Sequence, residues 1–409
     1  MSEKEVFPEY SGRSLAEIPG TVFSIFNIET ELEKLDEEIL DTSKDYENVL
    51  LILIDGFGLS QLENFSGGFF EKIIQVGELS KITSVFPSAT PATLTSINTG
   101  RKPVEHGLLG WEMYYREIDS KIVTLPFRTL DGEKPHEIFE DFEPEMLFEG
   151  EPVYPELSEK GVKCFSVTSR ETVDSEYTGL VKKGSEKISY LNTADMMLQI
   201  KNTLEEENGK KYIYGYTPDV DSIGHLRGPK TPDEKNQLEM ISDALERNLV
   251  ENIDQNKVED TLVMITADHG QIRHGEKIDL FQWEEVTDCI KKDGNGDLIT
   301  PSGNPGRSVF LHVEDGKVGQ VQSFLEGKIG GKVLKTEEAV EKGYFGEEDE
   351  CEKFRDRAGE LVIIGDEDKI YWSEPEELED IGVHGGLRKE EMEIPLLTAE
   401  LSELVEQDN

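Results

Sequence analysis

The sequence has few cysteines, far fewer basic than acidic residues, and no long apolar run. Its three cysteines stand far apart without CxxC or CxxH spacing, so neither a disulfide framework nor a thiolate zinc site is indicated. The longest apolar run, residues 49–54, is far shorter than the roughly 20 residues that cross a bilayer. The first residues also lack the basic and apolar regions of a signal peptide. These absences predict a reduced, cytoplasmic protein that does not enter a membrane.

Basic residues are outnumbered by acidic ones to an unusual degree. Lysine and arginine total 42, aspartate and glutamate total 87, and the net charge is −45. This charge repels nucleic-acid backbones and anionic headgroups, which excludes a nucleic-acid scaffold or an acidic membrane as partner. The expected partner is therefore small, cationic or bridged by a metal. A halophilic source suits such an acidic surface, but the plentiful lysines fit an ordinary cytoplasm equally well.

Short apolar segments alternate with helical segments along the 409 residues. In the segments predicted as strands, apolar and polar residues do not strictly alternate, which is typical of strands buried on both faces of a parallel sheet. These segments are residues 49–54, 82–86, 163–167, 212–216, 262–266, 309–313 and 361–364. Residues 193–207 and 232–253 carry apolar side chains at helical spacing. The pattern predicts an α/β fold with a doubly wound, mainly parallel sheet flanked by helices.

Two stretches interrupt the alternation of predicted strands and helices and indicate how the chain is divided. Residues 111–155 have no clear period, and residues 277–305 end in a turn-rich segment, so both are expected to be cap-like insertions over the strand ends. Residues 1–45 are predicted to be an acidic N-terminal extension that packs on the core, with an amphipathic piece at 28–40. Residues 46–409 then form one catalytic domain that includes the insertions.

Acidic residues and histidines follow several of the predicted strands. Any one of them is explained equally well by ordinary loop polarity. Ligands of open α/β sheets gather at the carboxyl ends of strands, however, so together these residues predict two nearly equal metal-ligand sets. The residues concerned are Asp55, Asp221 with His225, Asp268 with His269, and the glycine-flanked His384.

Residues 85–94 pass from a strand through small residues into a predicted helix. Pro91 suits the first turn of that helix, and Thr90 is expected at its N-terminus, above the sheet edge. An anion is favoured there by the helix dipole, so the Thr90 hydroxyl is a candidate nucleophile. The alternative is that Thr90 only caps the helix.

From Asp55 to Leu397 these motifs resemble the alkaline phosphatase superfamily, and within it the type I phosphodiesterase and nucleotide pyrophosphatase branch. The resemblance rests on Asp55, on the sequence Phe-Pro-Ser-Ala-Thr ending at Thr90, on Asp221 with His225, on Ala-Asp-His-Gly around Asp268 and His269, and on His384-Gly-Gly. It implies an alkaline-phosphatase-like fold. It also implies that Asp55, Thr90, Asp268 and His269 bind one metal ion and that Asp221, His225 and His384 bind the other.

The resemblance implies hydrolysis of phosphodiesters or nucleotide pyrophosphates through a phosphothreonine on Thr90. Two divalent metal ions stabilise the threonine alkoxide, and mixed Asp and His ligation favours zinc, with manganese or iron as substitutes. Where the family has a phosphate-contacting asparagine three residues beyond the nucleophile, this chain has Thr93, the candidate substrate-binding residue. The alternatives are a phosphomonoesterase or phosphomutase with the same bimetal core, and a noncatalytic metal-binding protein. The oligomeric state stays open.

Overall fold

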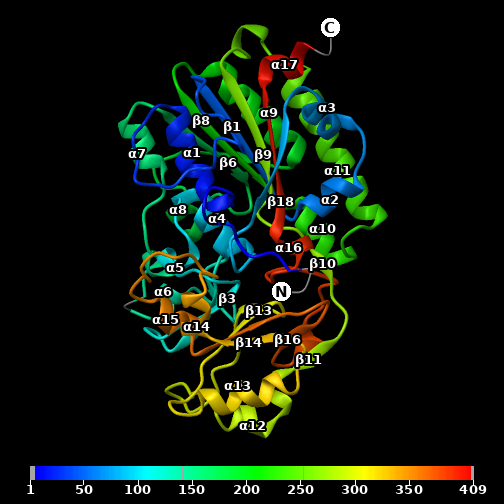
Figure 1. The fold of residues 1–409 in the computed structure, drawn as a ribbon. Coiled ribbons are helices and arrows are strands. Elements are labelled where there is room, and N and C mark those ends of the chain that lie inside the picture. Colours follow the sequence, from blue (N-terminus) through cyan, green and yellow to red (C-terminus); the bar gives the residue numbers. More distant parts are fainter. Residues whose placement is uncertain (1–4, 141, 252, 407–409) are drawn as a thin grey trace.

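The computed structural model describes residues 5–140, 142–251 and 253–406, and a seven-stranded sheet forms the upper half of the molecule in Figure 1. Its order is β2-β18-β9-β1-β8-β6-β7, and only β18 runs antiparallel to its neighbours. The strands are β1 (Asn48–Ile54), β2 (Glu78–Thr83), β6 (Lys163–Ser169), β7 (Glu186–Tyr190), β8 (Lys211–Thr217), β9 (Thr261–Thr266) and β18 (Glu393–Glu400). The predicted doubly wound α/β class is confirmed.

Helices cover both faces of this sheet, which explains why its central strands are apolar on both sides. On one face lie α3 (Gly68–Val76), α9 (Thr193–Glu206), α11 (Pro232–Ala244) and α17 (Leu401–Glu406). The other face carries α1 (Ile18–Ile25), α4 (Thr90–Thr99), α7 (Tyr154–Glu159) and α8 (Glu176–Val181). The predicted helix at 193–207 is confirmed as α9, whereas the one at 232–253 ends as an α-helix at Ala244 and continues as a π-helical segment, Leu245–Val250.

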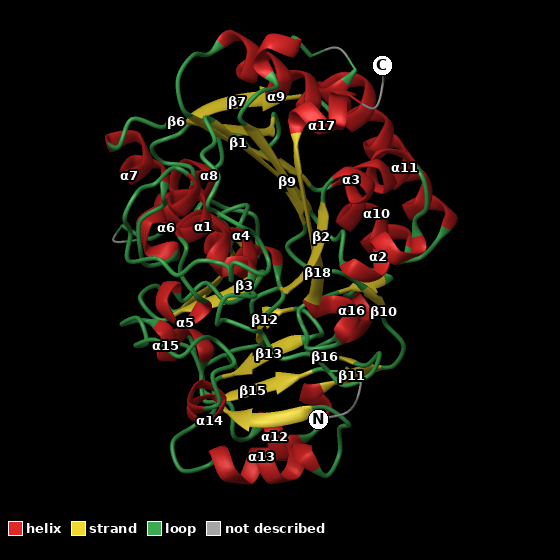
Figure 2. Cartoon of the chain, turned by 45° about the horizontal axis from the view of Figure 1, so that its top comes forward, coloured by secondary structure: helices red, strands yellow, loops and turns green. Residues whose placement is uncertain are grey.

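A second sheet, entirely antiparallel, forms the lower half of the molecule (Figure 2). Its order is β14-β15-β13-β12-β3-β4-β5, and the strands are β3 (Glu112–Tyr115), β4 (Ser120–Val123), β5 (Arg128–Thr129), β12 (Ser302–Asn304), β13 (Ser308–Leu311), β14 (Lys332–Lys335) and β15 (Leu361–Ile364). The stretches 111–155 and 277–305 both contribute strands to it. Two small ladders complete the strands: β10 (Ile272–Arg273) with β17 (Gly382–Val383), and β11 (Lys277–Asp279) with β16 (Ile370–Trp372).

The remaining helices are short and lie in connections around the two sheets. They are α2 (Leu59–Asn64), α5 (Pro103–His106), α6 (Pro135–Ile138), α10 (Asp219–Arg227), α12 (Glu284–Thr287), α13 (Val318–Glu326), α14 (Thr336–Glu341), α15 (Phe354–Ala358) and α16 (Lys389–Met392). Searching the described ranges finds no helix that combines the length and the apolarity needed to cross a membrane.

The placement of residues 309–313 and 361–364 in the main parallel sheet is wrong, because these segments are β13 and β15 of the second sheet. Their side chains alternate between two cores. Val309 and Leu311 pack into a cluster of their own, while Phe310 packs into the main core between the sheets. An antiparallel strand covered on both faces therefore shows the same continuous apolar pattern as a parallel one.

The N-terminal segment packs into the main core. Ile18, Val22 and Phe23 of α1 are fully buried there, and Ser14 forms a β-bridge with Thr83 of β2. Residues 28–40, the amphipathic piece, contain turns and no helix, although Leu35 is buried.

Candidate active site

Three neighbouring strands deliver the predicted ligands to one edge of the main sheet. β1 leads directly into Asp55, β8 leads into α10 with Asp221 and His225, and β9 leads into Asp268 and His269. Parallel strands that lie next to each other place their carboxyl ends together, so these residues converge although more than 200 positions separate the first from the last.

His384 and Thr90 reach the same place by different routes. The β10–β17 ladder pairs Ile272 with Val383, which brings His384 beside the segment that follows His269. Thr90 is the first residue of α4, and its hydroxyl oxygen lies 3.1 Å from His269 Nε2. The structure thus brings all seven predicted metal-site residues to one region of the molecule.

The donor atoms form two overlapping groups. Ligand atoms of Asp221, His225 and His384 lie within 4.8 Å of one another, and so do those of Asp55, Asp221 and His269. Asp221 therefore belongs to both groups. The second group is extended by Asp268, whose Oδ2 lies 3.2 Å from His269 Nε2.

Each of the three histidines is oriented by a backbone carbonyl. Nδ1 of His225 donates to Gly382 O at 2.8 Å, Nδ1 of His269 donates to Gly270 O at 3.1 Å, and Nδ1 of His384 donates to Ser88 O at 2.9 Å. This pattern commits each Nδ1 to a backbone carbonyl and leaves every Nε2 facing the carboxylates. It is the arrangement that metal-ligating imidazoles need.

A glycine allows Asp55 and Asp221 to approach each other. Gly56 has φ +74°, and a side chain on it would lie only 2.8 Å from Asp221 Cα. The close contact lets Asp221 N donate to Asp55 O at 3.0 Å, and Gly56 N donates to Asp268 Oδ1 at 3.1 Å. The backbone therefore holds the three carboxylates together despite their charge.

Burial and mutual repulsion perturb these carboxylates. Burial, followed by the charges of Asp268 and Asp221, holds the pKa of Asp55 well above its ordinary value. Burial and the charge of Asp221 also raise the pKa of Asp268. For Asp221 burial acts in the same direction, but the neighbouring His225 outweighs it and lowers the pKa. Three carboxylates held this close together repel one another, and a bound cation would offset that repulsion.

The pKa values of the three histidines are also shifted in opposite directions. Burial lowers the pKa of His269 to about 4 and that of His384 to about 3, so both are neutral near pH 7. Burial opposes protonation of His225 as well, but Asp221, 3.2 Å away, raises its pKa to about 9.

The donor set fits a pair of divalent cations. Asp55 is 1% exposed, and its Oδ1 has no hydrogen-bond partner among the described residues. Among the described residues, the three carboxylates form ion pairs with histidines and none with lysine or arginine. Three carboxylates, three imidazoles and one hydroxyl are the oxygen and nitrogen ligands that zinc and related metals take in catalytic sites.

Thr93, the candidate substrate contact, lies one turn into α4 and is fully buried. Its hydroxyl lies 3.0 Å from Thr90 O, 3.1 Å from Ala89 O and 3.3 Å from Asp268 Oδ2. It therefore contacts a ligand carboxylate, and its role toward substrate stays a prediction.

Sequence reasoning missed two residues that hold the site. The Tyr216 hydroxyl donates to Asp55 Oδ2 at 2.5 Å, and the Gln271 amide donates to Asp221 Oδ1 and, at 3.1 Å, to Asp221 O. Tyr216 is the next-to-last residue of β8, and Gln271 follows the Asp-His-Gly motif. In the sequence, only their positions next to the predicted metal-ligand motifs could have indicated them.

The family model of type I phosphodiesterase / nucleotide pyrophosphatase matches residues 49–387. The chain belongs to this family. It is therefore a hydrolase of phosphoric ester bonds, acting on phosphodiesters or pyrophosphates, and the family is metal-dependent. The match spans every predicted metal-site residue.

Solved structures of the alkaline phosphatase superfamily share the fold. Murine ectonucleotide pyrophosphatase / phosphodiesterase 5 is 19% identical with a TM-score of 0.61, covering 85% of this chain and 87% of that one. The same murine protein in complex with AMP is 18% identical with a TM-score of 0.61, covering 88% and 93%. Phosphonoacetate hydrolase from Sinorhizobium meliloti 1021, in complex with phosphonoformate, is 18% identical with a TM-score of 0.60, covering 85% and 89%. At these identities the likeness is one of fold.

Proposed function

We propose that the chain hydrolyses phosphodiesters or nucleotide pyrophosphates through a covalent phosphothreonine on Thr90, between two divalent cations. Asp55, Thr90, Asp268 and His269 would hold one cation, and Asp221, His225 and His384 would hold the other. The supporting observation is the position of the Thr90 hydroxyl, 3.1 Å from His269 Nε2, within a buried cluster of ligand side chains. When bound, the cations stabilise the threonine alkoxide and the negative charge of the phosphate.

The side chains of the site have separate tasks in this reaction. Attack by Thr90 Oγ forms an O–P bond while the bond from phosphorus to the leaving oxygen breaks, and a water molecule then cleaves the phosphothreonine and restores the hydroxyl. Thr90 stands at the positive end of α4, which favours the anionic phosphate. Tyr216 and Gln271 hold Asp55 and Asp221 in place.

We propose that Thr93 positions residues of the active site. Its hydroxyl lies between the Thr90 carbonyl oxygen and Asp268 Oδ2. It therefore orients the Asp268 carboxylate and stabilises the first turn of α4, which carries Thr90. A contact with a phosphate oxygen, as the family resemblance implies, remains part of the proposal.

The cavity beside Thr90 has room for an organic group of the substrate. A pocket of about 630 Å³ extends from Thr90, Asp55 and Asp221 toward α8, which is far more room than an inorganic phosphate fills. The organic group of a monoester or one organic group of a diester fits there, so the volume alone does not separate the two substrate classes. The phosphomonoesterase alternative is tested by comparing rates on nitrophenyl phosphate and bis-nitrophenyl phosphate.

The remaining expectations belong to the same proposal. The donor set favours zinc, with manganese or iron as substitutes, and the composition favours a cytoplasmic protein whose substrate is a small phosphoester or nucleotide. A halophilic source stays a prediction.

Substitution of Thr90 tests the mechanism. Thr90→Ala removes the nucleophile, so we expect bis-nitrophenyl phosphate hydrolysis to fall by at least about a thousandfold, while Thr90→Ser retains measurable activity. Rapid acid quenching followed by peptide mass spectrometry should detect one phosphoryl group on the peptide that contains Thr90. Elemental analysis of the same preparations identifies the bound metals.

Thr99→Ala is the matched control, because Thr99 lies at the opposite end of the same helix and donates only to Thr95 O. We expect it to retain near-normal activity. Full hydrolytic activity in Thr90→Ala would remove the proposed mechanism.

A further inference from the structure

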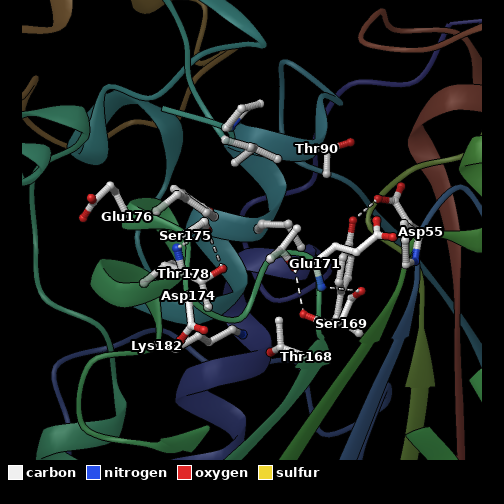
Figure 3. A pocket seen from close by; sticks show the side chains of 18 of the residues that line it. Asp55, Thr90, Thr168, Ser169, Glu171, Asp174, Ser175, Glu176, Thr178 and Lys182 are labelled. Carbon is white, nitrogen blue, oxygen red and sulfur yellow. Dashed lines mark hydrogen bonds between the residues drawn. The ribbon is translucent and has the colours of Figure 1, made fainter. Parts of the chain in front are cut away.

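The pocket that begins at Thr90 ends at a lysine that the proposed reaction does not use. Lys182 follows α8, is 6% exposed and lines the pocket (Figure 3). Its ammonium donates to Asn98 Oδ1 and, at 3.2 Å, to the Tyr154 hydroxyl, and it lies 3.2 Å from the centre of the Tyr214 ring. No ion pair between Lys182 and a carboxylate is found in the described ranges. Among the described residues, the groups in contact with this buried amine, those of Asn98, Tyr154 and Tyr214, are uncharged.

Two hydroxyl groups near Lys182 also lack partners. The Tyr214 hydroxyl and the Thr168 hydroxyl are buried, line the same pocket, and have no hydrogen-bond partner in the part of the chain that the structure describes. A buried hydroxyl without a hydrogen-bond partner destabilises the folded protein unless a ligand supplies the missing bond. Two hydroxyl donors and one ammonium form a donor set that suits an anionic oxygen ligand.

The secondary structure sets the distance between this inner end and the reaction centre. Thr90, Leu94 and Asn98 lie on one face of α4 and all line the pocket, and eight residues of helix rise about 12 Å. Tyr214 and Tyr216 lie on one face of β8, about 7 Å apart along the strand, and Tyr216 contacts Asp55. Figure 3 shows Thr90 and Lys182 at opposite sides of the pocket.

We propose that Lys182, Tyr214 and Thr168 form an anion subsite that binds a carboxylate or phosphate group on the substrate, roughly 7–12 Å from the reacting phosphorus. This inference rests on the proposed function and narrows it. The substrate class is a phosphoester or pyrophosphate whose organic part ends in a second anionic group.

Charge supports this assignment. Burial lowers the pKa of the Lys182 amine well below its ordinary value, and an anionic group within the pocket would favour the protonated amine again. Apart from Asp55 and Asp221 at the reaction centre, the acidic residues that line the pocket, Glu171, Asp174 and Glu176, are exposed or half-buried, so solvent screens them. An anionic group at the inner end would therefore pair with the buried Lys182 amine.

A matched pair of substrates tests the subsite. Nitrophenyl alkyl phosphodiesters are prepared whose alkyl chain ends either in a carboxylate or in its methyl ester, with the chain long enough to reach the inner end. We expect wild-type kcat/KM to be at least about tenfold higher for the carboxylate, and Lys182→Met to remove that preference. An ester with a terminal phosphate distinguishes the two anion sources: whichever anion is preferred over the methyl ester by the larger factor is the better ligand.

Lys183→Met is the control, because Lys183 is the next residue but is exposed and pairs with Glu151. It should keep the wild-type preference. Tyr214→Phe removes only the hydroxyl and should reduce the preference about threefold, which keeps the proposal testable if Lys182→Met fails to fold.

The outcomes separate the two proposals. If wild type hydrolyses the charged and neutral esters equally well while Thr90→Ala is inactive, the subsite is wrong and the proposed function stands. An equal loss of preference in Lys183→Met and Lys182→Met would also overturn the subsite. If the wild-type protein loaded with zinc, manganese or iron hydrolyses neither ester, the proposed function itself fails.

Discussion

At the scale of single residues, Glu17 is a buried carboxyl group that forms no ion pair with any residue in the described ranges. It is 1% exposed, its Oε2 accepts the Ser14 amide at 2.6 Å, and its Oε1 has no partner among the described residues. Burial raises its pKa to about 9, so it is protonated in the folded protein at neutral pH. The unfolded chain releases that proton near the ordinary value.

Glu17→Gln should therefore stabilise the protein increasingly as the pH rises. Between the two pKa values the folded state binds more protons than the unfolded state, so Glu17 makes the wild type less stable toward alkaline pH, by on the order of 1 kcal/mol per pH unit. Urea unfolding of wild type and Glu17→Gln at about pH 6 and about pH 8 measures the difference. Glu9→Gln, at an exposed position, is the control. A Glu17→Gln difference that does not change with pH would contradict the assignment.

The ligand residues could be predicted from the sequence because position alone identifies them. Asp55 and Asp268 follow apolar strands directly, and the carboxyl ends of adjacent parallel strands must meet. Lys182 could not be predicted in this way. It stands beside Lys183 with nothing in the sequence to distinguish them, and only the packing of α8 buries one and exposes the other.

At the scale of elements, a buried ion pair joins the second sheet to the active-site loop. Arg307, between β12 and β13, binds Glu391 of α16 at 2.7 Å, and both side chains are fully buried. Glu391 also accepts the Gly386 amide at 2.9 Å, and Asn304 of β12 donates to His384 O at 2.6 Å. The hairpin of the second sheet thus supports the loop that carries His384.

Arg307→Met should destabilise the protein by about 3–5 kcal/mol, because it leaves the Glu391 carboxylate buried and uncompensated. The double variant Arg307→Met/Glu391→Met should recover part of that loss, and urea unfolding of the four proteins gives the coupling. Asp356→Ala, which breaks the exposed pair with Arg116, should cost less than about 1 kcal/mol. Equal losses in Arg307→Met and Asp356→Ala would exclude a structural role for the buried pair.

Element types were easier to predict than sheet membership. The strands β1, β6, β8 and β9 were expected from apolar runs, whereas β18 was missed because Pro395 interrupts its pattern. β13 and β15 were assigned to the wrong sheet, since a strand packed between two cores has no polar face to reveal its direction. Pairing is a property of the folded chain that local sequence does not encode.

At the scale of the whole molecule, the net charge of −45 opposes the approach of an anionic substrate. Salt screens this long-range repulsion more than it screens the short contacts within the buried site. We expect KM for bis-nitrophenyl phosphate to fall as salt rises from low concentration, measured by steady-state kinetics at constant pH.

A zwitterionic phosphodiester, nitrophenyl phosphorylcholine, provides the control for this effect. Because it carries no net charge, its KM should respond less to salt than that of the anionic diester. A KM for the anionic diester that climbs steadily with added salt would contradict this account of the surface charge.

The insertion of β18 between β2 and β9 has a consequence for biosynthesis. During translation β2 leaves the ribosome early, yet its ladder partner in the sheet is synthesised more than 300 residues later. Until then the nascent chain exposes β2 and the edge of β9, and His384 has not yet joined the other ligands. Assembly of the catalytic centre is therefore coupled to completion of the sheet, so chains truncated before residue 393 should be targets for chaperones and proteases rather than partly active enzymes.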